Sequence, residues 1–507
     1  MRTTFRCRNG FALLLVSVMP MVATAQTVRE AWIATYRGPA DFGSVPSGMV
    51  LDGLGNLYVA GRAWVNSSAP DDSAVVKYDS NGNRFWSVLY DACGESDRAN
   101  ALAVDGQGNV YITGRSRCSV SGDDFQTVKY DANGTKLWSA RYVGGGSGDE
   151  AYAIAVDSQG NVYVTGRYHL LYSAYDYLTL KYDTNGNLLW AQTFAGNSSE
   201  YRDDVPVALA LDTQGNVYVT GYSPSLVNGV VDYVTVKYDT NGNLIWVARY
   251  NGTGDWVDIP KAIAVDAQGN VHVTGYSNGS GSMDDYLTVK YDANGNELWV
   301  ARYNGIGNGS DQAYALALDS QGNVFVTGQT WNGNNYDYAT VKYDANGNQL
   351  WVRHYNGTGG GQDVARALAV DSQGSVYVSG ASEGVGTDYD YLTIKYDANG
   401  NQHWIARYND ARNVRDTVSA IAVDSQGSVY VTGESVFSSV TVKYVQCPAI
   451  CPPDVNGDRL VDDADLLQVL FAFGSSGTNL GFEDVNCDGI VDDADLLSVL
   501  FAFGSGC

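Results

Sequence analysis

The sequence has little of what most metal-dependent and nucleophilic enzymes require. Histidine occurs only four times in 507 residues. The four lie far apart along the chain: His169, His272, His354 and His403. A zinc centre gathers three or four His, Cys or carboxylate ligands, and no such cluster is visible. The motifs of zinc proteases, serine hydrolases and phosphate-binding loops are also missing. The sequence therefore gives no direct sign of these chemistries.

Basic residues are scarce as well. The chain has 31 Lys and Arg against 56 Asp and Glu, which gives a net charge of −25. A nucleic-acid-binding protein needs a basic face to neutralise phosphates, so this class is excluded. Anionic lipid is an equally poor partner. An acidic surface instead fits a soluble extracellular protein and the binding of cations.

Long apolar runs are missing, with one short exception. Residues 11–22 are mostly apolar, follow three arginines within the first eight residues, and precede Ala23-Thr24-Ala25. This order predicts a secretory signal peptide over residues 1–25, so we expect a secreted protein. No later stretch approaches the ~18 apolar residues of a membrane span. Six cysteines follow the signal, and an exported protein can oxidise them to disulfides.

One repeated sequence motif extends over most of the chain. Variants of "VDSQGNVYVTG" occur eight times, and their turn aspartates are 52 to 55 residues apart. Each unit has four β-like runs, here called strands A to D, exemplified by "AIAV", "NVYVTG", "TVKY" and "LWVARY". Asn-Gly between alternating apolar runs is a strong hairpin signal. Four short strands repeated eight times predict an all-β, eight-bladed β-propeller.

The eighth unit predicts how the ring closes. Its strand C, "TVKY" at 441–444, is not followed by a strand D, whereas "AWIATY" at 31–36 fits strand D and has no unit of its own. We expect residues 31–36 to pair with 440–444 and complete blade eight, which removes free sheet edges. One N-terminal strand closes one ring, which favours a single ring over two smaller ones.

The repeat also resembles a known family. The pattern Lys-Tyr-Asp, Asn-Gly-Asn, Trp and Val-Asp-x-x-Gly-Asn-Val-Tyr-Val-Thr-Gly is similar to that of the bacterial β-propeller repeat proteins, and covers about residues 29–445. The resemblance implies the fold. It implies little about function, since that family consists mostly of uncharacterised exported proteins.

The predicted topology separates two faces. The tight A–B and C–D turns share one face, and the longer D–A and B–C loops share the other, called here the variable face. Seven units carry an Asp eight positions before the turn Asp: Asp97, Asp149, Asp204, Asp258, Asp311, Asp363 and Asp416. These could bind a cation or a sugar, but we expect each to cap the N–H groups of its own loop.

Function should lie where the repeat is broken, on loops held by a rigid scaffold. Aromatic residues outside the repeat pattern are the candidate ligand-binding residues, since such rings stack on sugars or anchor partners: Trp64, His169, Tyr172, Trp256 and Trp331. The alternative is that they pack over neighbouring loops. Cys93 and Cys118 lie in two loops of blade two on this face, and we expect a disulfide between them.

The composition changes after the predicted propeller of residues 26–445. A linker at 446–453 leads to a tail at 454–507 with two copies of an acidic segment thirty residues apart. Their spacing fits calcium loops, which supply oxygen ligands at positions 1, 3, 5, 7, 9 and 12. The predicted ligands of two calcium ions are Asp454, Asn456, Asp458, Leu460, Asp462 and Asp465, then Asp484, Asn486, Asp488, Ile490, Asp492 and Asp495.

A duplicated calcium loop, each followed by one helix, resembles a type I dockerin over about residues 454–504. The resemblance implies attachment to a cohesin-like or cell-surface protein, with Asp463-Ala464 and Asp493-Ala494 at the partner-selecting positions. Arg459 replaces the usual Gly that Gly489 keeps, so we expect the first loop to bind calcium more weakly.

Two functions follow. The first is a secreted, non-catalytic binding protein, whose propeller recognises a ligand such as a glycan and whose tail attaches it in the presence of calcium. The alternative is a polysaccharide-degrading enzyme, because dockerins often accompany glycoside hydrolases and two carboxylates suffice for that reaction. We favour the binding protein, since the blades are regular and no catalytic constellation stands out.

Overall fold

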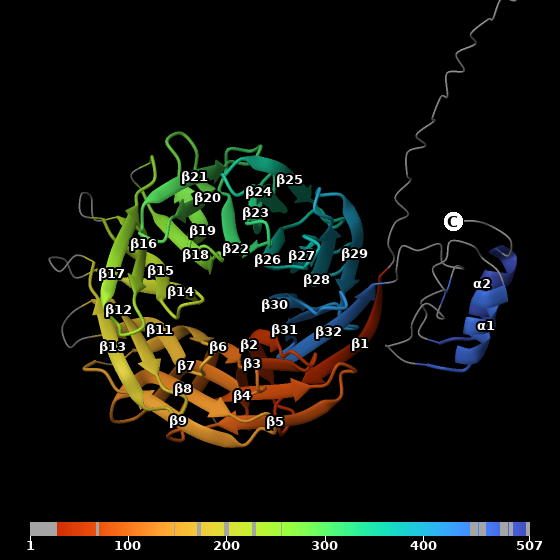
Figure 1. The fold of residues 1–507 in the computed structure, drawn as a ribbon, viewed down its shortest axis with the longest axis horizontal. Helices are drawn as coiled ribbons and strands as arrows, with labels where there is room; N and C mark the ends of the chain where they lie inside the picture. The colour runs from red at the N-terminus through yellow and green to blue at the C-terminus, as the bar shows by residue number, and fades with distance from the viewer. Residues whose placement is uncertain are drawn as a thin grey trace, which may run out of the picture.

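A closed ring of eight four-stranded antiparallel sheets makes up most of the structure (Figure 1). The computed structural model describes residues 28–66, 70–146, 148–169, 174–196, 202–225, 230–254, 256–446, 455, 463–476, 485 and 490–502. The predicted eight-bladed propeller is confirmed. The predicted signal peptide and almost all of the linker lie outside the described residues.

In blades 1 to 7, four consecutive strands run from the axis to the rim as strands A, B, C and D. The strands of blades 1 to 4 are β2 (Ser44–Leu51), β3 (Leu57–Trp64), β4 (Asp71–Tyr78), β5 (Arg84–Tyr90), β6 (Asp97–Val104), β7 (Val110–Cys118), β8 (Gly122–Tyr130), β9 (Lys136–Tyr142), β10 (Glu150–Val156), β11 (Val162–His169), β12 (Tyr175–Tyr182), β13 (Leu188–Phe194), β14 (Val205–Leu211), β15 (Val217–Pro224), β16 (Val231–Tyr238) and β17 (Leu244–Tyr250). Those of blades 5 to 7 are β18 (Asp258–Val265), β19 (Val271–Asn278), β20 (Asp284–Tyr291), β21 (Glu297–Tyr303), β22 (Gln312–Leu318), β23 (Val324–Trp331), β24 (Tyr336–Tyr343), β25 (Gln349–Tyr355), β26 (Asp363–Val370), β27 (Val376–Glu383), β28 (Tyr389–Tyr396) and β29 (Gln402–Tyr408).

Blade 8 joins the two ends of the described propeller chain. Its sheet has the order β1 (Val28–Tyr36), β32 (Ser438–Gln446), β31 (Val429–Ser435) and β30 (Asp416–Val423). Trp32 lies opposite Lys443, and Tyr36 lies opposite Ser439. The predicted closure by residues 31–36 is therefore confirmed, and both strands extend slightly beyond the predicted segments.

The strand D tryptophans hold neighbouring blades together at the rim. The Trp190 indole donates a hydrogen bond to the Thr240 carbonyl in the C–D turn of the next blade (3.2 Å). Gly242 of that turn has φ +85°, and a Cβ there would lie 2.8 Å from Cδ2 of Trp190. Trp32 donates in the same way to the Ser80 carbonyl (3.0 Å), which connects blade 8 to blade 1.

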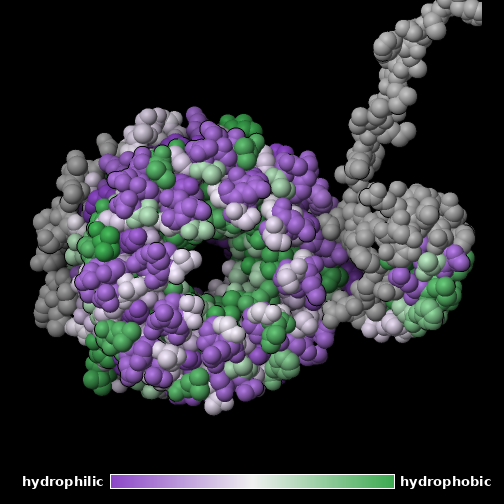
Figure 2. Space-filling view, viewed as in Figure 1, coloured by the Kyte–Doolittle hydropathy of each residue, from purple (hydrophilic) through white to green (hydrophobic). Residues whose placement is uncertain are grey.

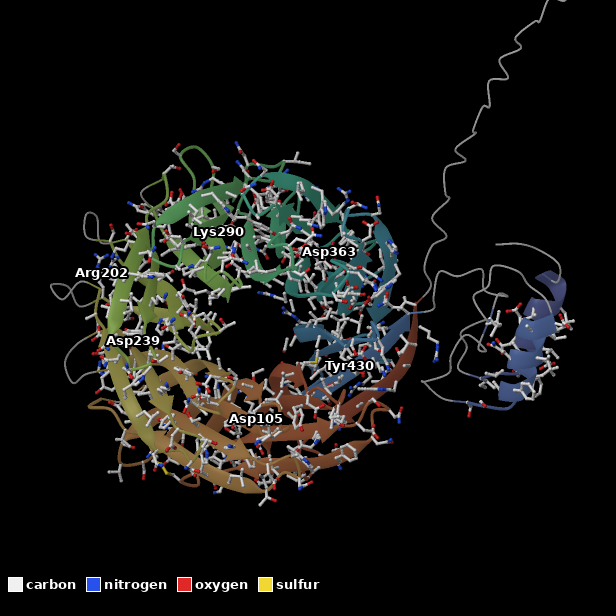
Figure 3. The ribbon with its side chains drawn as sticks, in the orientation of Figure 1. Asp105, Arg202, Asp239, Lys290, Asp363 and Tyr430 are labelled. Carbon is white, nitrogen blue, oxygen red and sulfur yellow. A yellow bond between two sulfur atoms is a disulfide. The ribbon has the colours of Figure 1, made fainter. Side chains whose placement is uncertain are left out.

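The aspartate of each described A–B and C–D turn organises its own hairpin. At Asp239, Oδ1 accepts the N–H groups of Asn241 and Asn243, and Oδ2 accepts the Asn243 side-chain amide. These bonds from Asn243 and the turn backbone hold the pKa of Asp239 below its ordinary value. Asp105 plays the same role in an A–B turn elsewhere around the ring (Figure 3). In the Asp239 turn only the glycine has a positive φ, as Gly242 does at +85°, so the aspartate's bonds hold a turn whose left-handed position is taken by glycine.

Apolar cores fill the spaces between adjacent blades. Between blades 3 and 4, Tyr163 and Tyr177 pack with Val217, Val219 and Val236, all fully buried. Alternation along strands B and C places these side chains between the sheets. The repeat thus builds a similar core at each junction, which explains why so few of its positions vary.

The tail contains two helices, α1 (Asp463–Ala472) and α2 (Asp493–Ala502). Its small core consists of Val455, Val469, Val491 and Val499. Ser476 and Ile490 form an isolated antiparallel bridge between the two halves. Neither helix, nor any other in the described residues, has the length and hydrophobicity needed to cross a membrane.

Candidate functional site

A channel runs along the axis of the ring and is open in the space-filling view (Figure 2). Its wall is made by the eight A strands, each of which contacts the A strands of adjacent blades. In every blade the pairing of strands A and B skips one residue of strand A, directly before the repeated alanine (Gly48 in blade 1). This irregularity leaves one residue per blade outside the regular ladder.

We call these eight residues the bulge ring. They differ from blade to blade, although their neighbours hardly vary: Ser47, Asn100, Tyr152, Val207, Lys261, Tyr314, Arg366 and Ser419. A bulge frees a side chain from the alternation of the strand and often lies next to a functional site. These positions were not among the residues predicted from the sequence. The signal was available, because they are variable positions within an otherwise uniform strand.

Three of the eight bulge-ring residues link neighbouring A strands by hydrogen bonds. Ser47 Oγ donates to the Ala99 carbonyl of the next A strand (2.7 Å), and Ser419 Oγ donates to the Pro46 carbonyl across the closure (3.0 Å). Asn100 Nδ2 donates to the Ala151 carbonyl (2.9 Å). These small polar residues have a structural role.

Four other bulge-ring residues carry an aromatic ring or a positive charge: Tyr152, Lys261, Tyr314 and Arg366. Arg366 lies over the Tyr314 ring, with its Cζ 4.6 Å from the centroid, and Lys261 Nζ lies 5.5 Å from the centroid of Tyr276 on β19. Burial and the nearby Arg366 lower the pKa of Lys261. Burial raises the pKa of Tyr276 to about 12, with smaller contributions from Asp284, Tyr314 and Tyr222. Blades 4 to 7 thus share one aromatic and cationic surface at the channel.

Blade 3 continues this surface with a paired cation. Arg167 donates to Glu150 (3.2 Å), and its guanidinium lies 5.9 Å from the Tyr152 ring centroid. The Tyr152 hydroxyl donates to the same carboxylate (3.4 Å). Burial raises the pKa of Tyr152, with Glu150 adding to the effect.

The predicted aromatic ligand residues fall into three groups. Trp256 is 60 % exposed. Trp64 and Trp331 are partly buried: the Arg62 guanidinium lies 5.2 Å from the Trp64 ring, and Trp331 packs edge-on against Tyr336. His169 packs against Tyr175 with ring centroids 5.1 Å apart. Tyr172 lies outside the described residues.

Trp331 also covers glycines of the preceding D–A loop. A Cβ at Gly309 would lie 2.3 Å from Cδ1 of Trp331. The backbone N–H of Trp331 donates to Asp311 (2.9 Å). Packing over a neighbouring loop therefore accounts for Trp331. Of the three tryptophans outside strand D, Trp256 offers the most free ring surface.

The seven repeated aspartates at the start of the A strands are buried and cap loops, as expected. Each is at most 2 % exposed. Asp258 accepts the Gly252 N–H (2.6 Å), and Asp363 accepts the Gly357 N–H (2.6 Å). Asp149 instead accepts the His169 N–H (2.7 Å), and burial raises its pKa to about 6. These residues support the loops and are not a ring of ligands at the channel mouth.

A second carboxylate position depends on an arginine of strand D. Asp285 pairs with Arg302 (3.0 Å), and Asp390 pairs with Arg407 (2.8 Å). In blade 1 the arginine position holds Leu89, and the unpaired carboxylate is Asp72. Burial raises the pKa of Asp72 to about 6, with repulsion from Asp91, Asp97 and Asp71 adding to it.

Blade 1 thus borders a cluster of acids. Carboxylate oxygens of Asp72, Asp91 and Asp97 lie within 4.8 Å of one another. Asp91 Oδ1 accepts the Cys93 N–H (3.0 Å), and Cys93 forms a disulfide with Cys118, with Cα atoms 5.4 Å apart. The predicted pair of cysteines therefore connects the two loops of blade 2 beside this cluster.

Grooves on the turn face contain further carboxylates. One groove of about 830 Å³ lies at the closure and is lined by Asp52 and Asp424 with Lys443. Asp424 Oδ1 accepts the N–H groups of Gln426 and Ser428, and Oδ2 accepts the Tyr430 hydroxyl. These acids hold the turns, and similar grooves recur between blades 3 and 4 and between blades 7 and 8.

Most of the predicted calcium ligands lie outside the described residues: Asp454, Asn456, Asp458, Leu460, Asp462, Asp484, Asn486 and Asp488. Among the described ones, Asp465 and Asp495 are fully buried in the first turns of α1 and α2. Asp495 Oδ2 accepts the Asp492 N–H (2.9 Å). A buried carboxylate at the same place in both repeats fits a cation site, because buried charges need a counter-charge.

Comparisons with known proteins agree on the propeller. A model described as "Beta-propeller repeat" matches residues 137–167, 245–281 and 299–337. Sqt1 from Chaetomium thermophilum, a solved structure, covers 84 % of this chain and 100 % of its own, with a TM-score of 0.52 and 12 % identity. At this identity the likeness shows the fold alone.

Two curated proteins match shorter segments. An uncharacterized WD repeat-containing protein of Acanthamoeba polyphaga mimivirus is 26 % identical over 201 residues, which are 30 % of this chain and 14 % of that protein. Regulatory protein FlaEY of Caulobacter vibrioides is 28 % identical over 170 residues, or 29 % of this chain and 17 % of that protein. The alignments thus span only a small part of either relative. The comparisons show β-propeller repeats within this chain and indicate no activity.

Proposed function

We propose that the protein is a non-catalytic binding protein, whose propeller recognises a carbohydrate at the channel and on the adjoining variable face. One observation carries this proposal. The residues that build the blades are nearly uniform, whereas the bulge ring differs from blade to blade and presents Tyr152, Lys261, Tyr314 and Arg366. The tyrosine rings suit the apolar C–H face of a sugar. The hydroxyls of Tyr152 and Tyr314 donate to Glu150 and Gln312, and their oxygens can still accept hydrogen bonds from sugar hydroxyls.

The same proposal includes export and attachment. Residues 1–25 direct secretion, and the tail binds two calcium ions and then attaches the protein to a cohesin-like or cell-surface partner. The duplicated acidic loops and the buried Asp465 and Asp495 support a calcium-dependent module. Attachment would hold the propeller near its ligand.

A glycan array tests the binding function. We expect the purified full-length chain to bind a defined set of glycans, and Trp256→Ala to weaken at least part of this binding, because the indole is exposed. Trp331→Ala is the matched control, since that ring packs over its own loop and its loss should lower stability rather than change the set of glycans. Binding of no glycan by the wild-type chain would contradict the proposed function.

A further inference from the structure

Two channel cations lack the carboxylate partners that other cations near the inner strands have. Arg98 pairs with Asp71 (3.0 Å), and Arg167 pairs with Glu150 (3.2 Å). Lys261 and Arg366 have no acidic side chain within ion-pair distance in the part of the chain that the structure describes. Their strands, β18 and β26, both contact β22 of blade 6, and Arg366 reaches over Tyr314 of β22. Burial lowers the pKa of Lys261, and Arg366 lowers it further, in agreement with this placement.

The two cations repel each other. The chain carries a net charge of −25, so carboxylates are abundant, yet none within the described residues forms an ion pair with either cation. Repulsion between two nearby cations costs free energy unless an anion relieves it. The acid near the adjacent tyrosines is Asp284, and its Oδ2 already accepts bonds from Ser310 Oγ and Gln312 Nε2, each 2.9 Å.

The surroundings indicate what kind of anion would fit. Lys261 lies by Tyr276 of the same blade, Arg366 lies over Tyr314 of the blade before it, and Tyr222 adjoins Tyr276 from blade 4. Each cation therefore lies beside a tyrosine ring, with Lys261 partly buried and Arg366 exposed. A sugar that carries a carboxylate matches both parts, since it offers an anion to the cations and hydroxyl and C–H surface to the tyrosines.

We propose that Lys261 and Arg366 bind the carboxylate of an acidic saccharide, with Tyr276 and Tyr314 contacting its sugar ring. This inference rests on the proposed carbohydrate-binding function and specifies its ligand as a uronate-containing glycan. An acidic peptide would satisfy the cations but would not use the tyrosine hydroxyls in the same way, so it serves as a competing ligand in the test.

The test is isothermal titration of the full-length chain with a hexamer of galacturonate, with cellohexaose and with hexaglutamate. We expect the galacturonate hexamer to bind more tightly than either other ligand, and more weakly as salt increases. Lys261→Gln with Arg366→Gln should weaken this binding at least tenfold. The matched control, Arg84→Gln with Lys136→Gln on the outer strands β5 and β9, removes the same charge and should leave the affinity unchanged.

Three outcomes would overturn the inference. The first is equal binding of the galacturonate hexamer by the wild type and the Lys261 and Arg366 variant. The second is tighter binding of hexaglutamate than of the saccharide. The third is tighter binding of the neutral cellohexaose, which would leave the proposed carbohydrate-binding function intact. Failure of all saccharides here together with a blank glycan array would instead overturn the proposed function itself. A thermal melt of each variant shows whether it is folded.

Discussion

A single side chain of strand D decides whether a buried carboxylate has a counter-charge. Arg302 and Arg407 neutralise Asp285 and Asp390, whereas Leu89 leaves Asp72 without a cation. A group whose folded pKa exceeds its unfolded value stabilises the fold at low pH, and this stability is lost as the pH rises through the folded pKa. For Asp72 this window runs from about 4 to about 6, since burial raises its pKa from 3.8 to about 6.

Asp72→Asn should therefore stabilise the propeller at pH 7.5. We expect a gain of about 1 kcal/mol in the free energy of unfolding, after allowing for solvent screening, and a smaller gain at pH 5. Urea unfolding at the two pH values measures it. Asp124→Asn is the control in blade 2, where the carboxylate pairs with Arg141 and accepts Ser121 Oγ. That change should cost about 2 kcal/mol, because it removes the counter-charge of the partly buried Arg141, which keeps its bonds to the Ser116 and Gly122 carbonyls. A destabilising Asp72→Asn would contradict this account.

Turn glycines differ in the space that is available for an added methyl group. Gly55 and Gly242 have similar φ values of +79° and +85°, but a Cβ meets nothing at Gly55 and lies 2.8 Å from Trp190 at Gly242. Gly55→Ala should cost about 1 kcal/mol from the left-handed backbone alone. Gly242→Ala should cost about 3 kcal/mol, because it also displaces the indole. Equal losses in chemical unfolding would show that the tryptophan contact between blades contributes little.

At the scale of elements, β1 holds the ring shut. Deletion of residues 28–36 removes the outer strand of blade 8, the pairing with β32 and the hydrogen bond from Trp32 to the Ser80 carbonyl. We expect the melting temperature to fall by roughly 10 °C or more, since several kcal/mol of contacts disappear and a sheet edge is exposed. An unchanged melting temperature by differential scanning calorimetry would show that the ring does not depend on this strand.

The tail is expected to bind calcium, and this expectation can be tested by titration. Calorimetric titration of the calcium-depleted chain should detect two calcium ions per molecule, with the loop beginning at Asp454 weaker because Arg459 replaces a glycine. Asp495→Ala should remove one of the two ions, because the carboxylate is buried where loop and helix meet. Asp493→Ala removes an equal charge from an exposed position and should retain both ions. Full calcium binding by Asp495→Ala would contradict the assignment of ligands.

At the scale of the whole molecule, the sequence was most informative about the features that all repeats share, because every blade packs in the same way. The number of blades, the closure by residues 31–36 and the capping aspartates could be predicted from spacing alone, since a uniform blade must be built the same way each time. The loop residues were harder. Trp64 and Trp331 break the repeat, yet they pack on Arg62 and on glycines of a neighbouring loop. Periodicity cannot show such contacts between loops.

The variability of the bulge-ring positions can be read from the sequence, but only the strand register shows that these residues are unpaired. Lys261 and Arg366 are in different blades, 105 residues apart in the chain, and only the ring brings them together. Their lack of carboxylate partners depends equally on the fold. A site built from one residue per repeat leaves no compact motif in the sequence.

The most direct measurement concerns the bulge ring itself. Blades 1 and 8 already carry serine there, at Ser47 and Ser419, so Tyr152→Ser, Lys261→Ser, Tyr314→Ser and Arg366→Ser combined should preserve the fold. We predict that this fourfold variant melts as one cooperative unit, within a few degrees of the wild type, and loses binding to the glycans that the wild type recognises on an array. A folded variant that binds the same glycans with unchanged affinity would contradict the claim that the channel is the binding site.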